Sequence, residues 1–307
     1  MVAVTRCQPK SSASPEGARR HSRHAYHSTI YIVILPCVAL LSTSDIDTAA
    51  AFVARSWRTE SSYDRLPPQL RCLDGASNLD GLAVHLRALA YLDPTDGVAG
   101  YKIGSSSRGA RDSMGPGFRP FGVLRDSRVF PSGSVINLDR LAAGLVEPEL
   151  CLLISRPLRG SAVSPAEARG AIDAVTPSLE ILSRRMNIDG ASDAVKLADG
   201  LYQWGVACGR PHHTDIDLRA VDVTLLVDGA PAGTSRTDFR TVDDPFTSVA
   251  RVCRILDHFG LGLEPGQRVI TGSIVAPSSL SDPCQVRGDF GQLGVVDVRF
   301  ERDATHE

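Results

Sequence analysis

The pattern of hydrophobic and polar positions changes near residue 100 of the chain. In residues 45–57 and 79–92, apolar side chains recur every three or four positions, which predicts two amphipathic helices. After residue 100, short apolar runs alternate with turns that contain glycine and proline, as is typical of strands. We therefore expect a helical N-terminal part followed by a larger part built on sheets.

Helix starts and turn residues divide this larger part into elements. Ser164 and Glu167, with Pro165 between them, have the sequence of a capping box and predict a helix start. A further helix is expected between Asp244 and a stop at Gly260. Strands are expected at residues 100–104, 121–124, 146–154, 178–182, 221–227, 268–272, 285–290 and 295–300. Few helices and many short strands predict an α+β fold with a mostly antiparallel or mixed sheet.

The first segment, residues 1–43, differs from the rest in composition. It is rich in Arg, His and Ser, and Glu16 is the only acidic residue in its first 28 positions. The apolar run at 30–41 is interrupted by a proline and is too short for a comfortable membrane span. A basic lead before an apolar run is also the pattern of a secretory signal, and an Arg-rich, acid-poor lead that of an organelle transit peptide. We expect a disordered or targeting-like extension on a cytoplasmic protein, which leaves organelle targeting and export open.

Composition limits the partners and the kinds of site that fit the chain. The 33 Lys and Arg residues against 35 Asp and Glu give a formal net charge of -2, so neither nucleic acid nor an acidic membrane is expected as the main partner. The seven cysteines are scattered without a C-x-x-C pair, which argues against a zinc site and against a disulfide framework. The candidate chemistry therefore lies in carboxylates.

Two glutamates stand at the entrance of the apolar run 146–154. Glu147 and Glu149 are two residues apart, and such residues point to the same face of a strand, so both carboxylates aim at one spot. Pro148 between them has no N–H to donate and suggests an edge position or a strand start. With Glu180 from another apolar run, three carboxylates suit a hard cation such as Mg²⁺ or Mn²⁺. Simple solvent exposure of the pair is the alternative that the spacing leaves open.

Six segments match one protein family in order and spacing. They are residues 100–104 (GYKIG), 121–124 (FGVL), 146–149 (VEPE), 177–181 (PSLEI), 198–200 (ADG) and 270–273 (ITGS). Through them the chain resembles the 2-keto-4-pentenoate hydratase group, the 2-oxo-acid hydratases and decarboxylases of the fumarylacetoacetate hydrolase superfamily. The resemblance implies an α+β fold in which a small N-terminal helical region, residues 44–98, precedes a mixed β-sandwich or roll with flanking helices. That roll, residues 99–303, is expected to be the metal-binding catalytic domain.

The resemblance also implies roles for individual residues. Glu147, Glu149 and Glu180 are expected to hold a divalent metal, Mg²⁺ or Mn²⁺, as the cofactor. Lys102 is expected to line the substrate site, where it could bind a carboxylate, or act as an acid if burial lowers its pKa. A surface lysine in a turn is the alternative for Lys102.

The remaining site residues fall in two later segments. Gly272 and Ser273 are expected to bind substrate. Asp199 and Tyr202 are expected to be catalytic, although hydratases of the group typically read A-D-N-A-S where residues 198–202 read ADGLY. Tyr202 stands about where the serine would be, and Asp199 could orient a water, pair with the site lysine, or be a solvated loop residue.

The implied activity is a metal-dependent hydro-lyase reaction. It adds water to a 2-oxo-4-enoate, such as one derived from 2-hydroxypenta-2,4-dienoate, and gives a 4-hydroxy-2-oxo acid in the catabolism of aromatic ring-cleavage products. The alternatives are a 2-oxo-3-enedioate decarboxylase, an acylpyruvate hydrolase, and a catalytically inactive metal-binding subunit. The expected partners are the small 2-oxo acid, further copies of the chain in a homo-oligomer, and a decarboxylase or aldolase of the same pathway.

A loop after the site lysine carries Arg108, Arg111 and Arg119. These arginines could recognise a second substrate carboxylate, which would favour a diacid. Solvated charges on a mobile loop are the default interpretation.

Overall fold

The computed structural model describes residues 41–186, 188, 190–213, 215–238 and 240–303. Residues 1–40 of the predicted extension therefore lie outside the described residues. Both helices expected in the N-terminal part are confirmed: α1 spans Thr43–Thr59 and α2 spans Asn78–Leu89, with the short 3-10 helix η1 at Pro68–Leu73 between them. Helix α2 begins with a reciprocal capping box between Ser77 and Asp80, which satisfies backbone donors of its first turn.

The larger sheet is mixed and holds nine strands. Its bounds are β1 Val98–Ile103, β2 Phe121–Arg125, β3 Val129–Pro131, β5 Gly144–Ile154, β7 Ile172–Ser183, β8 Gln203–Cys208, β9 His212–His213, β13 Arg268–Ile270 and β14 Ser278–Leu280. The path runs β2-β1-β13-β5-β7-β8-β3, with β14 beside β5 and β9 beside β7. Only β1 with β13 and β3 with β8 run parallel among these pairs, so the expected α+β fold with a mixed sheet is confirmed.

A second sheet packs on the first. It has the order β11-β10-β15-β16-β4, with bounds β4 Ser134–Asn137, β10 Asp222–Val227, β11 Ala230–Arg236, β15 Cys284–Asp289 and β16 Val295–Glu301. Val296, Val298 and Phe300 alternate with more exposed neighbours along β16 and are fully buried. Because β16 contacts β7 and β8, this apolar row closes a sandwich between the two sheets.

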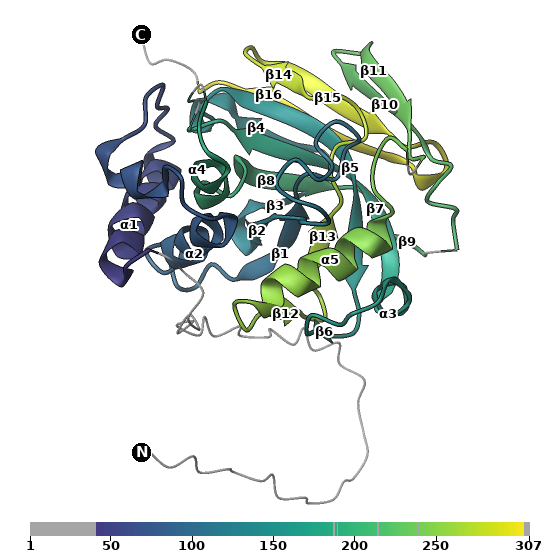
Figure 1. Ribbon diagram of the computed structural model, residues 1–307. Helices are drawn as coiled ribbons and strands as arrows, with labels where there is room; N and C mark the ends of the chain where they lie inside the picture. The colour runs from purple at the N-terminus through teal and green to yellow at the C-terminus, as the bar shows by residue number, and fades with distance from the viewer. Residues whose placement is uncertain (1–40, 187, 189, 214, 239, 304–307) are drawn as a thin grey trace, which may run out of the picture.

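Helices cover the remaining faces (Figure 1). They are α3 at Pro165–Gly170, α4 at Asp193–Ala198 and α5 at Pro245–Asp257. Three further 3-10 helices, η2, η3 and η4, lie at Asp126–Arg128, Leu138–Arg140 and Gly291–Leu293. A separate two-stranded sheet pairs β6, Leu158–Arg159, with β12, Gly262–Leu263. Helix α5 lies across the β1 side of the large sheet, whereas α4 packs on α2 at the helical end of the molecule. Within the described part of the chain, no helix is both long enough and apolar enough to cross a membrane.

The large sheet rolls up so that its first strand, β2, contacts β8. Gly122 of β2 makes this approach possible, because a Cβ there would lie 2.5 Å from the carbonyl oxygen of Gly200 and 3.1 Å from Cγ of Lys102. Only glycine fits between these atoms without a backbone shift. The sheet therefore curves until strands near its two ends meet, and the candidate site lies on its concave face.

Candidate functional site

The register of two central strands brings three carboxylates together. Strands β5 and β7 pair antiparallel with Glu147 directly opposite Glu180, and Glu149 lies on the same face two residues further along β5. Ligand oxygens of the three glutamates all lie within 4.8 Å of one another. Glu149 and Glu180 are each 1% exposed, whereas Glu147 is half-buried and forms the open side of the cluster. The concave face thus carries a compact all-oxygen donor set.

Pro148 is not at an edge or at a strand start, which corrects the expectation from the sequence. It lies inside β5, opposite Leu179 of β7. On its other side, β14 pairs with residues 144–146 and β13 with residues 151–153, so a gap in the ladder falls at residues 147–150. The Pro148 carbonyl points toward this gap, where it accepts from the Ile274 N–H. The proline nitrogen points the same way, so its lack of an N–H costs no hydrogen bond with β7.

Lys102 projects from β1 into the same cluster. Its Nζ lies 3.1 Å from Oε1 and 3.4 Å from Oε2 of Glu180, and the residue is 6% exposed. Burial acts to lower the pKa of Lys102, but the charges of Glu180, Glu147 and Glu149 outweigh it and raise the pKa above its ordinary value. Lys102 is therefore a cation in this structure, and neither the surface-lysine reading nor a pKa lowered by burial describes it.

One lysine does not neutralise three acids. Burial, and next the charge of Glu180, raise the pKa of Glu147 to about 7. Burial and both neighbouring glutamates raise the pKa of Glu149 well above its usual range, against Lys102 and a backbone N–H. Oε1 of Glu180 is buried without a hydrogen-bond donor in good geometry, although it lies near the ammonium of Lys102. A hard divalent cation fits this set, because it would offset the repulsion and take up the free lone pairs.

The raised pKa of Glu147 predicts a pH-dependent cation affinity. The pKa of about 7 lies above the ordinary 4.5, so the contribution of this group to folding stability is complete below about pH 4.5 and is lost as the pH rises through 7. A cation needs the ionised forms of Glu147 and of Glu149, whose pKa is raised as well, so Mg²⁺ affinity should rise by at least about tenfold per pH unit below pH 7. Calorimetric titrations at several pH values measure this. Glu147→Gln should make the profile less steep, because only Glu149 then has a raised pKa, and an unchanged profile in that variant would contradict the role of Glu147.

The two other residues expected at the substrate differ in placement. The backbone N–H of Gly272 donates to Oε2 of Glu149 at 2.7 Å, so Gly272 borders the cluster directly. The hydroxyl of Ser273 donates instead to the Val275 carbonyl of its own loop. Ser106 was missed from the sequence: a Cβ on Gly272 would lie 1.7 Å from its Oγ, so its hydroxyl packs against the backbone that binds Glu149. Its position shortly after the site lysine was the available signal.

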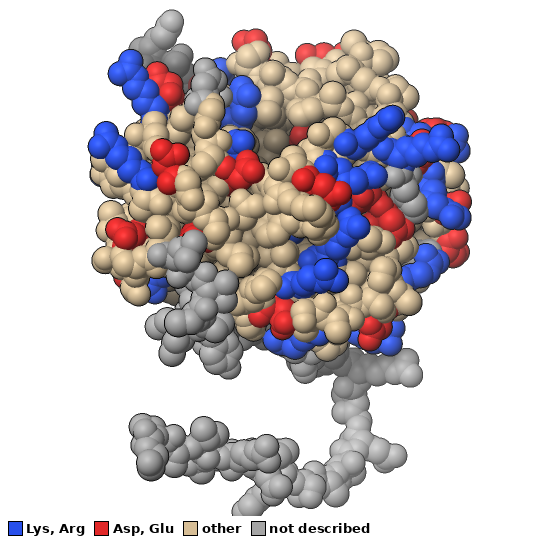
Figure 2. Space-filling model, viewed as in Figure 1, with Lys and Arg blue, Asp and Glu red and all other residues tan. Residues whose placement is uncertain are grey.

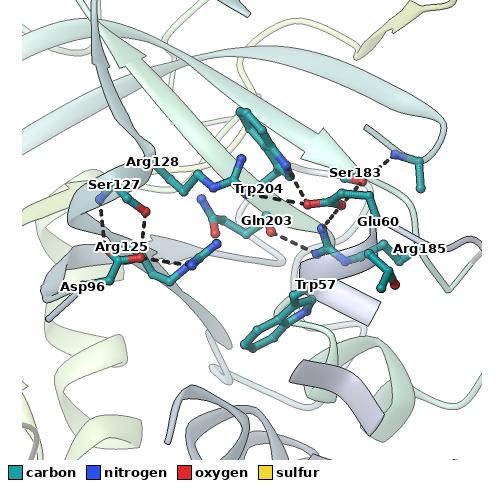
Figure 3. A network of polar contacts seen from close by, with 12 residues as sticks. Trp57, Glu60, Asp96, Arg125, Ser127, Arg128, Ser183, Arg185, Gln203 and Trp204 are labelled. Carbon is teal, nitrogen blue, oxygen red and sulfur yellow. Dashed lines mark hydrogen bonds and ion pairs between the residues drawn. The ribbon is translucent and has the colours of Figure 1, made fainter. Parts of the chain in front are cut away.

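Asp199 belongs to a buried ion-pair network around Arg185, whose contacts with Glu60 and Gln203 are drawn in Figure 3. Its Oδ1 accepts from Nε of Arg185 and from Nε1 of Trp57, both at 2.9 Å, and Asp199 is 1% exposed. Arg185 also reaches Glu60, with Nη1 at 3.2 Å from Oε2. The structure therefore does not pair Asp199 with Lys102, and Asp199 is not a solvated loop residue either.

Tyr202 lies at the end of an unusual turn. Gly200, Leu201 and Tyr202 have φ values of 68°, 56° and 65°, so three successive residues are left-handed. The Tyr202 hydroxyl donates to the Met186 carbonyl at 3.3 Å rather than to a glutamate of the cluster. Burial and then the charge of Asp199 raise the pKa of Tyr202, against the cations of Arg184 and Lys102, so the phenol stays protonated at neutral pH.

The Asp199–Arg185 pair predicts a large stability effect. Asp199→Ala should lower the free energy of unfolding by on the order of 3 kcal/mol, because it leaves a buried guanidinium with one partner fewer. Urea denaturation measures this. The matched control is Asp222→Ala. Nη1 of Arg236 lies 3.6 Å from Oδ1 of Asp222, and both side chains are exposed, so loss of this ion pair should cost less than about 0.5 kcal/mol. Equal effects in the two variants would contradict the buried role.

Two arginines of the loop after β1, Arg111 and Arg119, are held in place rather than solvated. Arg119 is fully buried, with Nε 2.6 Å from Asp243 and Nη1 2.8 Å from Asp112. Arg111 also pairs with Asp243, at 2.7 Å. Of the three, only Arg108 has an exposed side chain. Arg119 differs from the expected solvated charge because it is buried, and a buried guanidinium needs a carboxylate partner.

Comparison with known proteins supports the resemblance seen in the motifs. The chain is 29% identical over 211 residues to a 2-oxo-hept-4-ene-1,7-dioate hydratase of Escherichia coli, covering 66% of this chain and 79% of the relative. It is 28% identical over 197 residues to a 4-oxalocrotonate decarboxylase of a Pseudomonas species, covering 64% and 75%. No family model matches the chain.

The fold has a counterpart among solved structures. The 4-oxalocrotonate decarboxylase from Pseudomonas putida G7, complexed with magnesium and adipate, superposes with a TM-score of 0.79 at 20% identity, covering 86% of this chain and all of that one. At that identity the likeness shows the fold alone. The predicted similarity to 2-oxo-acid hydratases and decarboxylases is thus confirmed.

Proposed function

We propose that the chain is a metal-dependent hydro-lyase that adds water to a 2-oxo-4-enoate and forms a 4-hydroxy-2-oxo acid. The observation that carries the proposal is the convergence of Glu147, Glu149 and Glu180 on one point beside the ammonium of Lys102. The names of the relatives, hydratases and decarboxylases of 2-oxo acids, point to the same chemistry.

The donor set defines what each part contributes. When bound, a divalent cation supplies a Lewis acid for the carboxylate and 2-oxo oxygens of the substrate. Lys102 places a second positive charge next to the position where the enolate oxygen develops charge, and its N–H groups can donate to that oxygen. The Gly272 N–H fixes Glu149 through a 2.7 Å hydrogen bond, so this ligand needs no reorganisation when the substrate arrives.

Water is excluded from one side of the site. Below the glutamates the concave face is lined by Leu124, Cys151, Val206 and Ile270, all fully buried. The half-buried Glu147 marks the open side. A charged substrate head therefore enters at the carboxylates, in a setting of low dielectric where electrostatic stabilisation is strong.

Finer features are part of the proposal. The all-oxygen donor set supports Mg²⁺ or Mn²⁺ as the cation in the cell. The resemblance to the family supports a homo-oligomer, a cytoplasmic location and a decarboxylase or aldolase of the same pathway as a partner. Glu147, Glu149 and Glu180 act as metal ligands, and Lys102 and Gly272 act at the substrate.

Decarboxylation of a 2-oxo-3-enedioate is the second candidate, because a named relative and the solved neighbour are 4-oxalocrotonate decarboxylases. A diacid needs a group that reads its second carboxylate. Arg111 and Arg119 are both ion-paired to Asp243, so of the three loop arginines the exposed Arg108 is left to read it.

The experiment compares two substrates on the full-length protein. With Mg²⁺, 2-hydroxypenta-2,4-dienoate should be consumed with formation of 4-hydroxy-2-oxopentanoate, and a chelator should stop the reaction until Mg²⁺ is restored. Release of CO₂ from 2-oxohex-3-enedioate is measured in parallel. Faster CO₂ release than hydration would replace the hydratase by the decarboxylase, and no turnover of either substrate would reject both.

A further inference from the structure

One end of the rolled sheet carries the entrance of the site. Strands β1 and β13 run parallel, β5 runs antiparallel to both β13 and β7, and β8 runs antiparallel to β7. The segments that follow β1 and β7 therefore leave the sheet at the same end as the segment that leads into β8. Strand β5 also begins there, so the half-buried Glu147 lies nearer to this end than the buried Glu149. The site thus opens toward this end of the sheet.

Two leucines border the way out of the site. Leu145 of β5 lies directly opposite Leu182 of β7, two residues further along the same face than the pair Glu147 and Glu180. Leu145 is half-buried and Leu182 is 5% exposed, and neither belongs to the apolar clusters that form the core of the described residues. Because the closed apolar floor lies in the opposite direction, beyond Glu149, the two leucines form an apolar wall on the open side.

Arg184 stands at the same end, directly after β7. The chain turns there, with the Arg185 N–H donating to the Ser183 carbonyl at 2.9 Å. The two flanking side chains both bind Oε2 of Glu60, from Ser183 Oγ at 3.0 Å and from Arg185 Nη1 at 3.2 Å, as Figure 3 shows. The side chain of Arg184, between them in the sequence, therefore points away from Glu60.

Tyr202, which leads into β8, places Arg184 on the side of the site lysine. Burial and then the charge of Asp199 raise the pKa of Tyr202, whereas the cations Arg184 and Lys102 both act to lower it. Such charge effects weaken with distance and are screened beyond about 10 Å, so the phenol lies near both cations. At about 3.3 Å per residue of strand, Arg184 lies on the order of 13 Å from Glu180. A long arginine side chain and an extended substrate can span that distance together.

The guanidinium of Arg184 has no partner. On the face drawn in Figure 2, acidic and basic side chains lie interspersed, and the adjacent Arg185 binds both Glu60 and Asp199. Nε of Arg184 is instead buried without a hydrogen-bond acceptor, and the residue makes no hydrogen bond or ion pair with any described residue, although it is half-buried. Its planar fork is therefore free to bind a carboxylate through paired hydrogen bonds.

We propose that Arg184 determines the specificity of the site by binding a second carboxylate at the far end of the substrate. A 2-oxo acid held by its head at the glutamates lays its hydrocarbon chain on Leu145 and Leu182, and its far carboxylate meets the guanidinium. The apolar wall between two charged ends suits an unbranched chain, so the substrate class is a linear 2-oxo-enedioate. This inference rests on the proposed function and applies to hydration and decarboxylation alike.

Two saturated ligands isolate the second carboxylate. 2-Oxohexanedioate and 2-oxohexanoate have the same length and the same head, and neither has a double bond to hydrate. Calorimetry on the full-length protein in excess Mg²⁺ measures the affinity for each ligand in the parent, in Arg184→Gln, in Arg184→Lys and in Arg108→Gln. Arg108 is the matched control, because it is the exposed arginine of the loop that leaves the sheet at the same end.

We expect the parent to bind the diacid at least about tenfold more tightly than the monoacid. Arg184→Gln should bind both alike with unchanged affinity for the monoacid, which also shows that the fold and the metal centre are intact. Arg184→Lys should keep part of the preference, and Arg108→Gln all of it.

Three results would overturn the inference while the proposed function stands. They are equal affinities in the parent, a preference kept in Arg184→Gln, and a preference lost in Arg108→Gln. If neither ligand binds in a Mg²⁺-dependent manner, the proposed function fails and the inference fails with it.

Discussion

Replacement of Glu149 by glutamine is expected to lower metal-dependent turnover by on the order of 10³-fold or more, while the fold stays intact. The amide oxygen of glutamine can still accept the 2.7 Å hydrogen bond from Gly272, so the local backbone keeps its partner. The negative charge is lost, and with it one of three ligands for the cation. Without metal, the variant should be as stable as the parent or more so, because a buried carboxylate among like charges disappears.

The measurement pairs kcat/KM over a range of Mg²⁺ concentrations with the metal content of the purified protein. Glu301→Gln is the matched control, because Glu301 lies exposed at the end of β16. An unfolded Glu149→Gln protein would indicate a structural role, and undiminished turnover would reject the metal centre.

Lys102→Met should lower kcat by on the order of 10²-fold, because a positioned donor to a developing oxyanion is removed. The same change should strengthen Mg²⁺ binding, since the ammonium, 3.1 Å from Glu180, competes with the cation for the same carboxylate. The metal-free protein should lose stability, because Glu180 and its neighbours keep their repulsion and lose their only close lysine.

This opposite movement of activity and metal affinity separates Lys102 from a residue with a purely structural role. Mg²⁺ titrations by calorimetry and steady-state kinetics follow the two quantities. Lys196→Met, which removes a half-exposed lysine paired to Asp193, should change neither. If Mg²⁺ binding weakens in Lys102→Met, the lysine does not face the cation site.

The arginine loop shows how the tertiary structure altered an interpretation. In the sequence, Arg119 is one of several arginines among glycines and serines, and nothing nearby indicates burial. In the fold it meets Asp243, 124 positions later, at the N-terminal end of α5. A local pattern cannot report such a pairing, because the partner is set by the docking of a helix on a loop.

The sequence by itself determined the features that depend on near neighbours. The capping boxes at Ser77 and Ser164, the helix start at Asp244 and the shared face of Glu147 and Glu149 all follow from backbone periodicity and from side chains a few residues apart.

Only the tertiary structure decided how distant segments meet. The register of β5 against β7 places Glu180 opposite Glu147, and a shift by one residue would have turned Glu180 to the other face. The roll of the sheet brings Lys102 to Glu180 across 78 positions, and the docking of α1 brings Trp57 to Asp199 across 142. Strand register and docking are set by the burial of whole apolar faces, to which each residue contributes a small part, so no single motif encodes them.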